Sequence, residues 1–183
     1  KVSEINASTW SVGGIIGEGC DAVTIKDSNN TANITWDRAS SEQRVQYSSV
    51  ALGGIAGRIL GGNALIENCH NKSNLYNGCY NNGSYDTYAK PNCLGGILGS
   101  FGLSKDTVTE TLTVRNCTNQ GKLRALRGFV AGIVGWAQNA QIEECNYTIG
   151  AFETDINPHA AGIIAGAYTS AYIKNCTAVV DIA

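Results

Sequence analysis

Charged side chains are scarce in this chain, and their scarcity argues against some classes of protein. Lys, Arg, Asp and Glu make up 15% of the 183 residues, whereas about a quarter is usual in a globular domain. The formal net charge is −2, and the most basic stretch holds only Lys122, Arg124 and Arg127. A protein that follows a phosphate backbone needs a larger basic surface, so the sequence argues against nucleic-acid binding.

Long apolar runs, proline and methionine are also rare or missing. No apolar run approaches the ~18 residues that a membrane-crossing helix needs, because glycines interrupt each one. The chain has 2 prolines, no methionine and 22 glycines, and Asn, Ser and Thr fill most other polar positions. This composition is typical of an all-β protein with many turns. The chain begins at Lys1 without Met, which predicts a segment whose signal and anchor lie outside it.

Residues that build catalytic and metal sites are sparse. The histidines are His70 and His159, and neither belongs to an H-E-x-x-H motif. Paired C-x-x-C ligands, a G-x-S-x-G elbow and a G-K-[ST] phosphate loop are missing as well. The best carboxylate pair, Glu153 and Asp155, shares a strand face, and we expect it to be solvated surface. His70 is expected to face solvent. The sequence therefore predicts no metal, no cofactor and no catalytic residue.

Two linked motifs recur five times in a fixed order, and they are the main signal of the sequence. The first motif reads GGIIG at 13–17, GGIAG at 53–57, GGILG at 95–99, AGIVG at 131–135 and AGIIA at 161–165. The second reads IKDS at 25–28, IENC at 66–69, VRNC at 114–117, IEEC at 142–145 and IKNC at 173–176. Such a pattern predicts a repeat protein in which each unit packs against its neighbours.

The residue types within the motifs indicate how each repeat folds. The second motif fits a strand that ends in a bend at its Asn or Asp, because these residues tolerate left-handed backbone. Glycines kept in a strand indicate close approach of neighbouring turns. We predict one domain, 1–183, forming a right-handed β-solenoid of about five irregular turns, with a β-prism or irregular β-roll as the alternative. Repeats begin near 13, 53, 95, 131 and 161, with insertions at about 40–47, 77–92 and 104–111. The most compact repeat is predicted to have three strands, at 129–137, 140–147 and 151–156.

The seven cysteines divide into a repeated set and three others. Four of them occupy the last position of the second motif, and a serine takes that position in the first repeat, which predicts a structural ladder of small buried side chains: Ser28, Cys69, Cys117, Cys145 and Cys176. Disulfides between adjacent positions of this ladder are not excluded by distance. Cys79 and Cys93 bracket an insertion, and a disulfide between them would fit an oxidising compartment.

The two motifs together, with their Asn-rich turns, resemble the GLUG repeat from residue 13 to residue 176. Isoleucine stands where the family name implies leucine, and Ala165 replaces the closing glycine of the last copy. GLUG repeats occur in large bacterial surface proteins and in the non-catalytic region of some IgA-specific zinc metallopeptidases. The resemblance implies an extracellular or cell-surface location, and it implies neighbouring domains in the same parent chain rather than an active site here.

One insertion has the composition of a recognition loop. Segment 76–92 places four tyrosines among Asn, Gly, Ser and Asp, a mixture suited to adaptable binding, and these predicted ligand-binding residues are Tyr76, Tyr80, Tyr85 and Tyr88. The sequence thus favours a non-catalytic structural or adhesive module that binds a glycan or a host surface protein. The alternative is a carbohydrate-active β-helix enzyme, a polysaccharide lyase or glycosidase, which rests on fold analogy alone.

Overall fold

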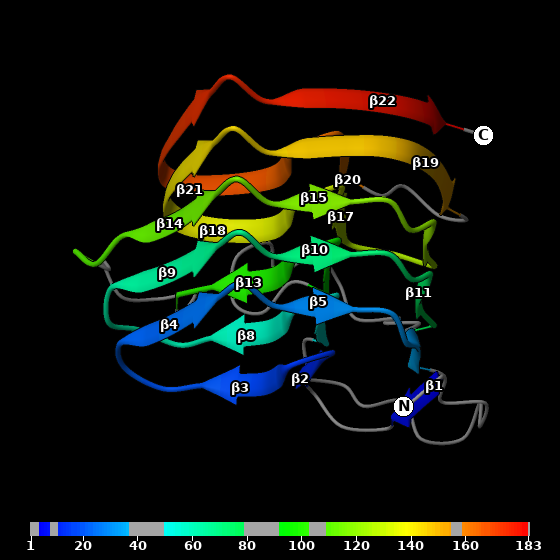
Figure 1. Ribbon diagram of the computed structural model, residues 1–183, viewed down its shortest axis with the longest axis horizontal. Helices are drawn as coiled ribbons and strands as arrows, with labels where there is room; N and C mark the ends of the chain where they lie inside the picture. The colour runs from blue at the N-terminus through cyan, green and yellow to red at the C-terminus, as the bar shows by residue number, and fades with distance from the viewer. Residues whose placement is uncertain are drawn as a thin grey trace.

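The computed structural model describes residues 4–7, 11–36, 50–78, 92–102, 109–154 and 159–182. Within these ranges the regular structure is all strand, and the strands form five coils stacked one on the next from the N-terminal to the C-terminal end (Figure 1). All pairings between coils are parallel, in three sheets, which confirms the predicted β-solenoid over the β-prism and β-roll. None of the described residues belongs to a helix long and apolar enough to span a membrane.

The first three coils have five strands each, and the last two have three strands each, of which the second and third are long. Coil 1 consists of β2 (Ser11–Gly13), β3 (Ile16–Gly19), β4 (Val23–Lys26), β5 (Asn29–Asn30) and β6 (Asn33–Trp36). Coil 2 consists of β7 (Ala51–Gly53), β8 (Ala56–Ile59), β9 (Ala64–Glu67), β10 (His70–Asn71) and β11 (Leu75–Asn77). Coil 3 consists of β12 (Cys93–Gly95), β13 (Leu98–Phe101), β14 (Leu112–Arg115), β15 (Thr118–Asn119) and β16 (Leu123–Ala125). Coil 4 consists of β17 (Phe129–Ala131), β18 (Val134–Glu143) and β19 (Asn146–Thr154), and coil 5 of β20 (His159–Ala161), β21 (Ile164–Lys174) and β22 (Thr177–Ile182). One further strand, β1 (Glu4–Ala7), precedes coil 1.

The strands of equivalent position make the three sheets. The first sheet takes the opening strand of each coil, in the order β2-β7-β12-β17-β20. The second contains the rows β3-β8-β13-β18 and β4-β9-β14-β18, with β21 on β18. The third contains the rows β5-β10-β15-β19 and β1-β6-β11-β16-β19, with β22 on β19. Because β18 and β19 each cover two strand positions, the predicted boundaries of the most compact repeat were wrong although its three strands were expected.

The second motif is aligned in register through all five coils. Its apolar residue pairs from coil to coil along one row: Ile25, Ile66, Val114, Ile142 and Ile173. Two residues later the backbone turns left-handed in every coil, with φ between 49° and 54° at Asp27, Asn68, Asn116, Glu144 and Asn175. The predicted bend is therefore confirmed. It makes each coil change direction at the same point.

The second glycine of the first motif lies close to a side chain of the third sheet in the same coil. A Cβ on Gly54 would lie 2.5 Å from Cγ of Asn71, and a Cβ on Gly14 would lie 2.6 Å from Cγ of Asn30. Every coil keeps glycine at this position, at 14, 54, 96, 132 and 162. In contrast, the first glycine is replaced by alanine in coils 4 and 5. The first glycine is equally confined where it occurs, because a Cβ on Gly53 would lie 1.9 Å from the backbone oxygen of Ala56. The second glycine is the one that all five coils retain.

The apolar side chains of the coils form two clusters inside the stack. One cluster lines the second sheet and includes the second-motif residues Ile66, Val114 and Ile142, all fully buried. The other lies between the first and third sheets and includes Leu75 and Leu123. The second glycine of each coil contacts residue 30, 71, 119, 147 or 178, and we call this row of contacts the waist. In coils 1 to 3 the contacting side chain is an asparagine.

Charges of alternating sign face one another along the outer side of the second motif. The residue that follows the apolar one is, in coil order, Lys26, Glu67, Arg115, Glu143 and Lys174. The Nζ of Lys26 lies 3.0 Å from Oε2 of Glu67, and the Nε of Arg115 binds the other oxygen of the same carboxylate. Both cations hold the pKa of Glu67 below its ordinary value, the hydrogen bond from Arg115 having the larger effect. Opposite charges across adjacent strands favour this register over its alternatives.

Candidate functional site

The candidate site lies on the outer face of the third sheet, where β6, β11, β16 and β19 run side by side. Alternation along each strand points Ile34, Leu75 and Leu123 inward, where they are buried. Their neighbours therefore point outward. Strand pairing sets four of these outward residues in one row across coils 1 to 4: Thr35, Tyr76, Arg124 and Glu153.

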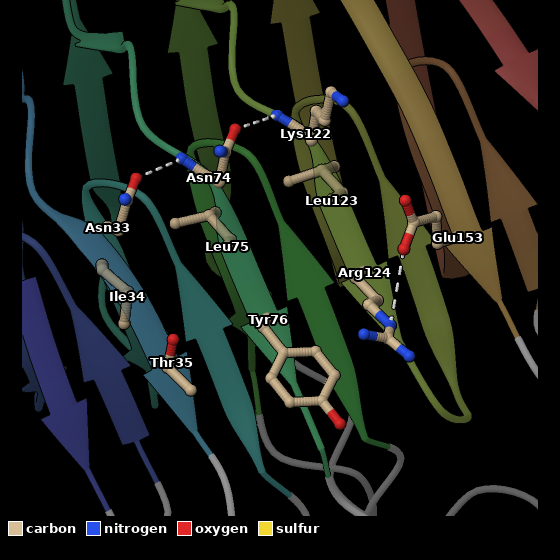
Figure 2. Close-up of a pocket in the computed structure, with 10 residues that line it drawn as sticks. All are labelled: Asn33, Ile34, Thr35, Asn74, Leu75, Tyr76, Lys122, Leu123, Arg124 and Glu153. Atoms are coloured by element: carbon tan, nitrogen blue, oxygen red, sulfur yellow. Dashed lines mark hydrogen bonds and ion pairs between the residues drawn. The ribbon is translucent and has the colours of Figure 1, made fainter.

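These side chains line a shallow groove of about 360 Å³. Tyr76 lies in its centre, and the guanidinium of Arg124 sits over the tyrosine ring, with Cζ 5.1 Å from the ring centroid. On its other side, Nε of Arg124 lies 3.5 Å from Oε2 of Glu153 (Figure 2). The cation is thus held between an aromatic face and a carboxylate. Thr35 is small, so the side of Tyr76 that faces coil 1 has no bulky neighbour in the row.

One edge of the groove is a row of amides that the stack itself orients. The Oδ1 of Asn33 accepts a hydrogen bond from the backbone N–H of Asn74, at 3.0 Å. The Oδ1 of Asn74 accepts one from the backbone N–H of Lys122, also at 3.0 Å. Figure 2 shows both bonds along the groove edge. Because each amide carbonyl is used by the next coil, the amino ends of Asn33 and Asn74 are left for solvent or a ligand.

The predicted recognition tyrosines are described only in part. Tyr76 lies in β11 and half-buried, at the centre of the groove, rather than in a loop as the sequence suggested. Tyr80, Tyr85 and Tyr88 lie outside the described residues, as do the insertion at 40–47, most of the insertion at 77–92 and residues 104–108 of the third insertion. The described strand β11 ends at Asn77, where the tyrosine-rich segment begins in the sequence.

The five ladder residues occupy equivalent positions immediately after the left-handed bend. Cys69, Cys117 and Cys145 are fully buried, while Ser28 and Cys176 are partly exposed. Each thiol donates to the carbonyl two residues earlier, at 3.2 or 3.3 Å, and the Ser28 hydroxyl does the same at 2.8 Å. All four cysteines are free thiols, so the disulfides considered between adjacent positions do not form. Hydrogen bonds to the neighbouring thiols, together with burial, raise the pKa of Cys117.

A second ladder, made of asparagines inside the waist, was not predicted from the sequence. The Nδ2 of Asn30 donates to Oδ1 of Asn71 at 2.9 Å, and Nδ2 of Asn71 donates to Oδ1 of Asn119 at 2.8 Å. All three are buried. The ladder stops in coil 4, where Tyr147 takes the position and buries a hydroxyl that bonds to none of the described residues. The signal was visible in the sequence, because an asparagine stands two residues after the ladder Ser or Cys in each of coils 1 to 3.

The histidines lie apart from one another. Nδ1 of His70 lies 2.8 Å from Oγ1 of Thr118 on the next coil, and His70 is partly exposed on β10, where its neighbour Asn71 is buried. His159 is exposed and stacks on Phe129, with ring centroids 4.7 Å apart. Among the described residues, no group of three or more His, Cys, Asp or Glu is placed to hold a metal ion.

Two predicted pairings reach beyond the described part of the chain. Cys93 is buried at the start of β12, and burial raises the pKa of its thiol. Cys79 is outside the described residues, so the disulfide between them stays a prediction. Asp155 is outside them as well. Its suggested companion Glu153 is exposed and binds Arg124.

Comparison with known proteins identified no relative of this chain. No protein-family model, no curated protein and no solved structure matches the chain.

Proposed function

We propose that this chain is a non-catalytic structural and adhesive repeat module of a larger extracellular bacterial surface protein, and that it binds glycan through the groove around Tyr76. The resemblance of its two motifs to GLUG repeats supports the location and the modular role. The stacked coils support the structural role, because rigid parallel strands hold the groove side chains in fixed register.

The observation that carries the binding role is the outward row on the third sheet. An aromatic ring with a polar tip suits the mixed apolar and hydroxylated faces of a sugar ring. Tyr76 supplies the ring, and the oriented amides of Asn33 and Asn74 supply donors to hydroxyl oxygens. We propose that the tyrosines of 77–92 extend this surface.

Binding of the purified chain to a glycan array tests the proposal. Tyr76→Ala is expected to remove binding, because it deletes the stacking surface without touching the buried clusters. Tyr172→Ala is the matched control, since Tyr172 is 53% exposed on β21, in a different sheet. An array with no bound glycan, or equal loss in the two variants, would contradict the proposal.

The enzyme alternative is tested with the same protein. Glycoside hydrolysis usually needs two carboxyl groups that flank the scissile bond. Among the described residues that line the groove, Glu153 is the single carboxylate, and it already binds Arg124. We therefore expect no new reducing ends or unsaturated products from plant, mucin and capsular polysaccharides. Turnover that disappears in Glu153→Gln would replace the adhesive proposal with the enzymatic one.

A further inference from the structure

The polar groups that the groove offers to a ligand are mostly hydrogen-bond donors. The amides of Asn33 and Asn74 have their carbonyl oxygens bonded to backbone N–H groups of the next coil, so each amide presents its amino group. Lys122 adds an ammonium beside Asn74 at the next coil. An arrangement that is rich in donors favours a ligand whose own groups accept hydrogen bonds.

The charges of the groove also favour a ligand with hydrogen-bond acceptors. Lys122 and Arg124 are two residues apart and face the same side of the sheet, and both are exposed. Glu153 offsets one of these charges, with its Oε2 3.5 Å from Nε of Arg124. A guanidinium has five donor hydrogens, so its remaining N–H groups are available to an oxyanion. The groove thus has an excess of positive charge in a protein whose net charge is −2.

The donors are arranged along the axis of the stack. Asn33, Asn74 and Lys122 belong to successive coils, and neighbouring parallel strands are ~4.8 Å apart. Tyr76 occupies the middle coil of the three, beside this row. A linear ligand that lies along the stack axis would therefore meet one donor per coil and the aromatic ring at its centre.

We propose that the groove binds an anionic saccharide chain, bearing carboxylate or sulfate groups, that lies along the stack axis. A sugar ring stacks on the free side of Tyr76, toward Thr35. An acidic group on another sugar of the same chain lies between Lys122 and Arg124, and hydroxyl oxygens along the chain accept hydrogen bonds from Asn33 and Asn74. Glu153 weakens this binding, because it competes for Arg124 and repels the ligand anion. This inference rests on the proposed glycan-binding function and specifies its ligand.

Two matched pairs of probes test the chemistry. Oligogalacturonate and its methyl ester share a backbone and differ in the carboxylate charge, and dextran sulfate and dextran differ in the sulfate. The pair that shows the difference identifies the anion. Titration calorimetry at low and moderate salt measures the affinity of the whole chain for each probe. We expect one charged probe to bind roughly tenfold or more tighter than its neutral partner, with the preference reduced by salt.

Variants separate this inference from the broader proposal. The double change Lys122→Gln with Arg124→Gln should remove the preference for the charged probe, whereas Glu153→Gln should raise the affinity for it a few-fold. Lys174→Gln removes one exposed charge from another sheet and should change neither. Tyr76→Ala should remove binding of both members of a pair.

The possible failures are distinguishable. Equal binding of charged and neutral probes, lost in Tyr76→Ala but unaffected by the charge variants, would overturn the anionic ligand and leave glycan binding intact. Equal weakening by Lys174→Gln would show attraction to the chain as a whole and would also overturn the inference. Absence of Tyr76-dependent binding to every probe and array glycan would overturn both proposals.

Discussion

Coils 3 and 5 carry the same two motifs, yet only coil 3 buries them. Val114 of coil 3 has no exposed surface, whereas Ile173 at the same position of coil 5 is 47% exposed. Cys117 is fully buried, and Cys176 is partly exposed. Coil 3 pairs with coils on both sides, while the described pairings of coil 5 are with coil 4 alone. The motif therefore supplies a surface that can be buried, and stacking between two neighbours buries it.

The two ends of the stack also differ from each other. In coil 1, Val12, Ile25 and Ile34 are 5%, 8% and 0% exposed, although this coil is also terminal among the five. Strand β1 pairs in parallel with β6 on the side away from coil 2, so part of this edge has a partner. In coil 5, Val179 is 62% exposed. The added strand covers coil 1 at the third sheet only, and Ile15 in the first motif of coil 1 is 50% exposed.

The largest expected difference comes from truncating the second-motif isoleucine in an interior coil and in the open coil. Ile142→Ala should lower the free energy of unfolding by about 2–5 kcal/mol, because it leaves a cavity among fully buried residues. Ile173→Ala should cost about 1 kcal/mol or less, because half of that side chain is already in water. Urea denaturation of both variants measures the contrast. Equal losses would show that the position matters for something other than burial between coils.

The next effect concerns the asparagine ladder of the waist. Asn71→Ala should destabilise the protein by about 2–3 kcal/mol, because it removes buried hydrogen bonds, among them those with the amides of Asn30 and Asn119 and the one from the Ser73 hydroxyl. Asn74→Ala is the matched control in the same coil, since Asn74 is exposed and water replaces its bond to Lys122. Its cost should stay below about 1 kcal/mol. A control that lost as much as Asn71→Ala would argue against the special role of the waist.

The position where the ladder stops should respond in the opposite direction. Tyr147→Phe removes a buried hydroxyl that makes no hydrogen bond to a described residue, while the ring that packs on Phe152 is kept. We expect a gain of about 1 kcal/mol, measured as a higher urea midpoint. Burial also raises the pKa of the hydroxyl, so the gain should persist from pH 6 to pH 9. A lower midpoint would indicate that the hydroxyl has a partner in solution.

A smaller gain is expected at the bend of coil 4. Glu144 holds φ at 54°, and asparagine or aspartate holds the equivalent position in the other four coils. Asparagine adopts this conformation at a lower cost, so Glu144→Asn should add about 0.5–1 kcal/mol of stability. The reverse change, Asn116→Glu, should remove a similar amount in coil 3, together with the bond from Asn116 to Asn68. A loss of stability in Glu144→Asn would mean that the glutamate makes a contact worth more than the backbone strain.

The smallest effect is the pH dependence contributed by the alternating charges. Arg115 and Lys26 lower the pKa of Glu67 in the folded state, so the folded state binds fewer protons there than the unfolded chain. The contribution is fully present above the unfolded value, near 4.5, and is lost as the pH falls through the lower folded value. Glu67→Gln should therefore flatten the stability curve below about pH 4.5. Replacing both cations by Gln should flatten it in the same way, and an unchanged slope in either variant would contradict this origin.

The fold was predictable because the motifs report directly on the geometry of one coil. The left-handed bend favours Asn or Asp, which hold it in four of the five coils, and the close approach at the waist favours glycine, which is present in all five. The number of strands in each coil was less predictable. In coils 1 to 3 the second and third sheets each receive two separate strands per coil, while β18 and β19 of coil 4 and β21 and β22 of coil 5 continue through both positions. A local motif does not determine whether a strand continues through a bend.

Of the residues that line the groove, only Tyr76 was predicted from the sequence as a ligand-binding residue. The residues that surround it were not predicted. Thr35, Arg124 and Glu153 reach the same row through pairing between coils whose lengths differ, so their proximity is invisible to local pattern. In the sequence, Arg124 stands out only as a member of the short basic stretch with Lys122 and Arg127. The alternating charges occupy the second position of the second motif, and the asparagines of the waist stand two residues after its last position, so both are visible once the second motifs are aligned.

Amide hydrogen exchange at three equivalent positions tests the role of stacking most directly. The N–H groups of Thr118, Asn146 and Thr177 donate to the carbonyls of Cys69, Cys117 and Cys145, at 3.0, 2.9 and 3.0 Å. Although the three hydrogen bonds have nearly equal geometry, their amide hydrogens should exchange at different rates if burial between two coils governs local opening of the structure. We predict that Thr118 and Asn146 exchange only with global unfolding and that Thr177 exchanges through a lower-energy opening of coil 5. Protection of Thr177 equal to that of Thr118 would contradict the account.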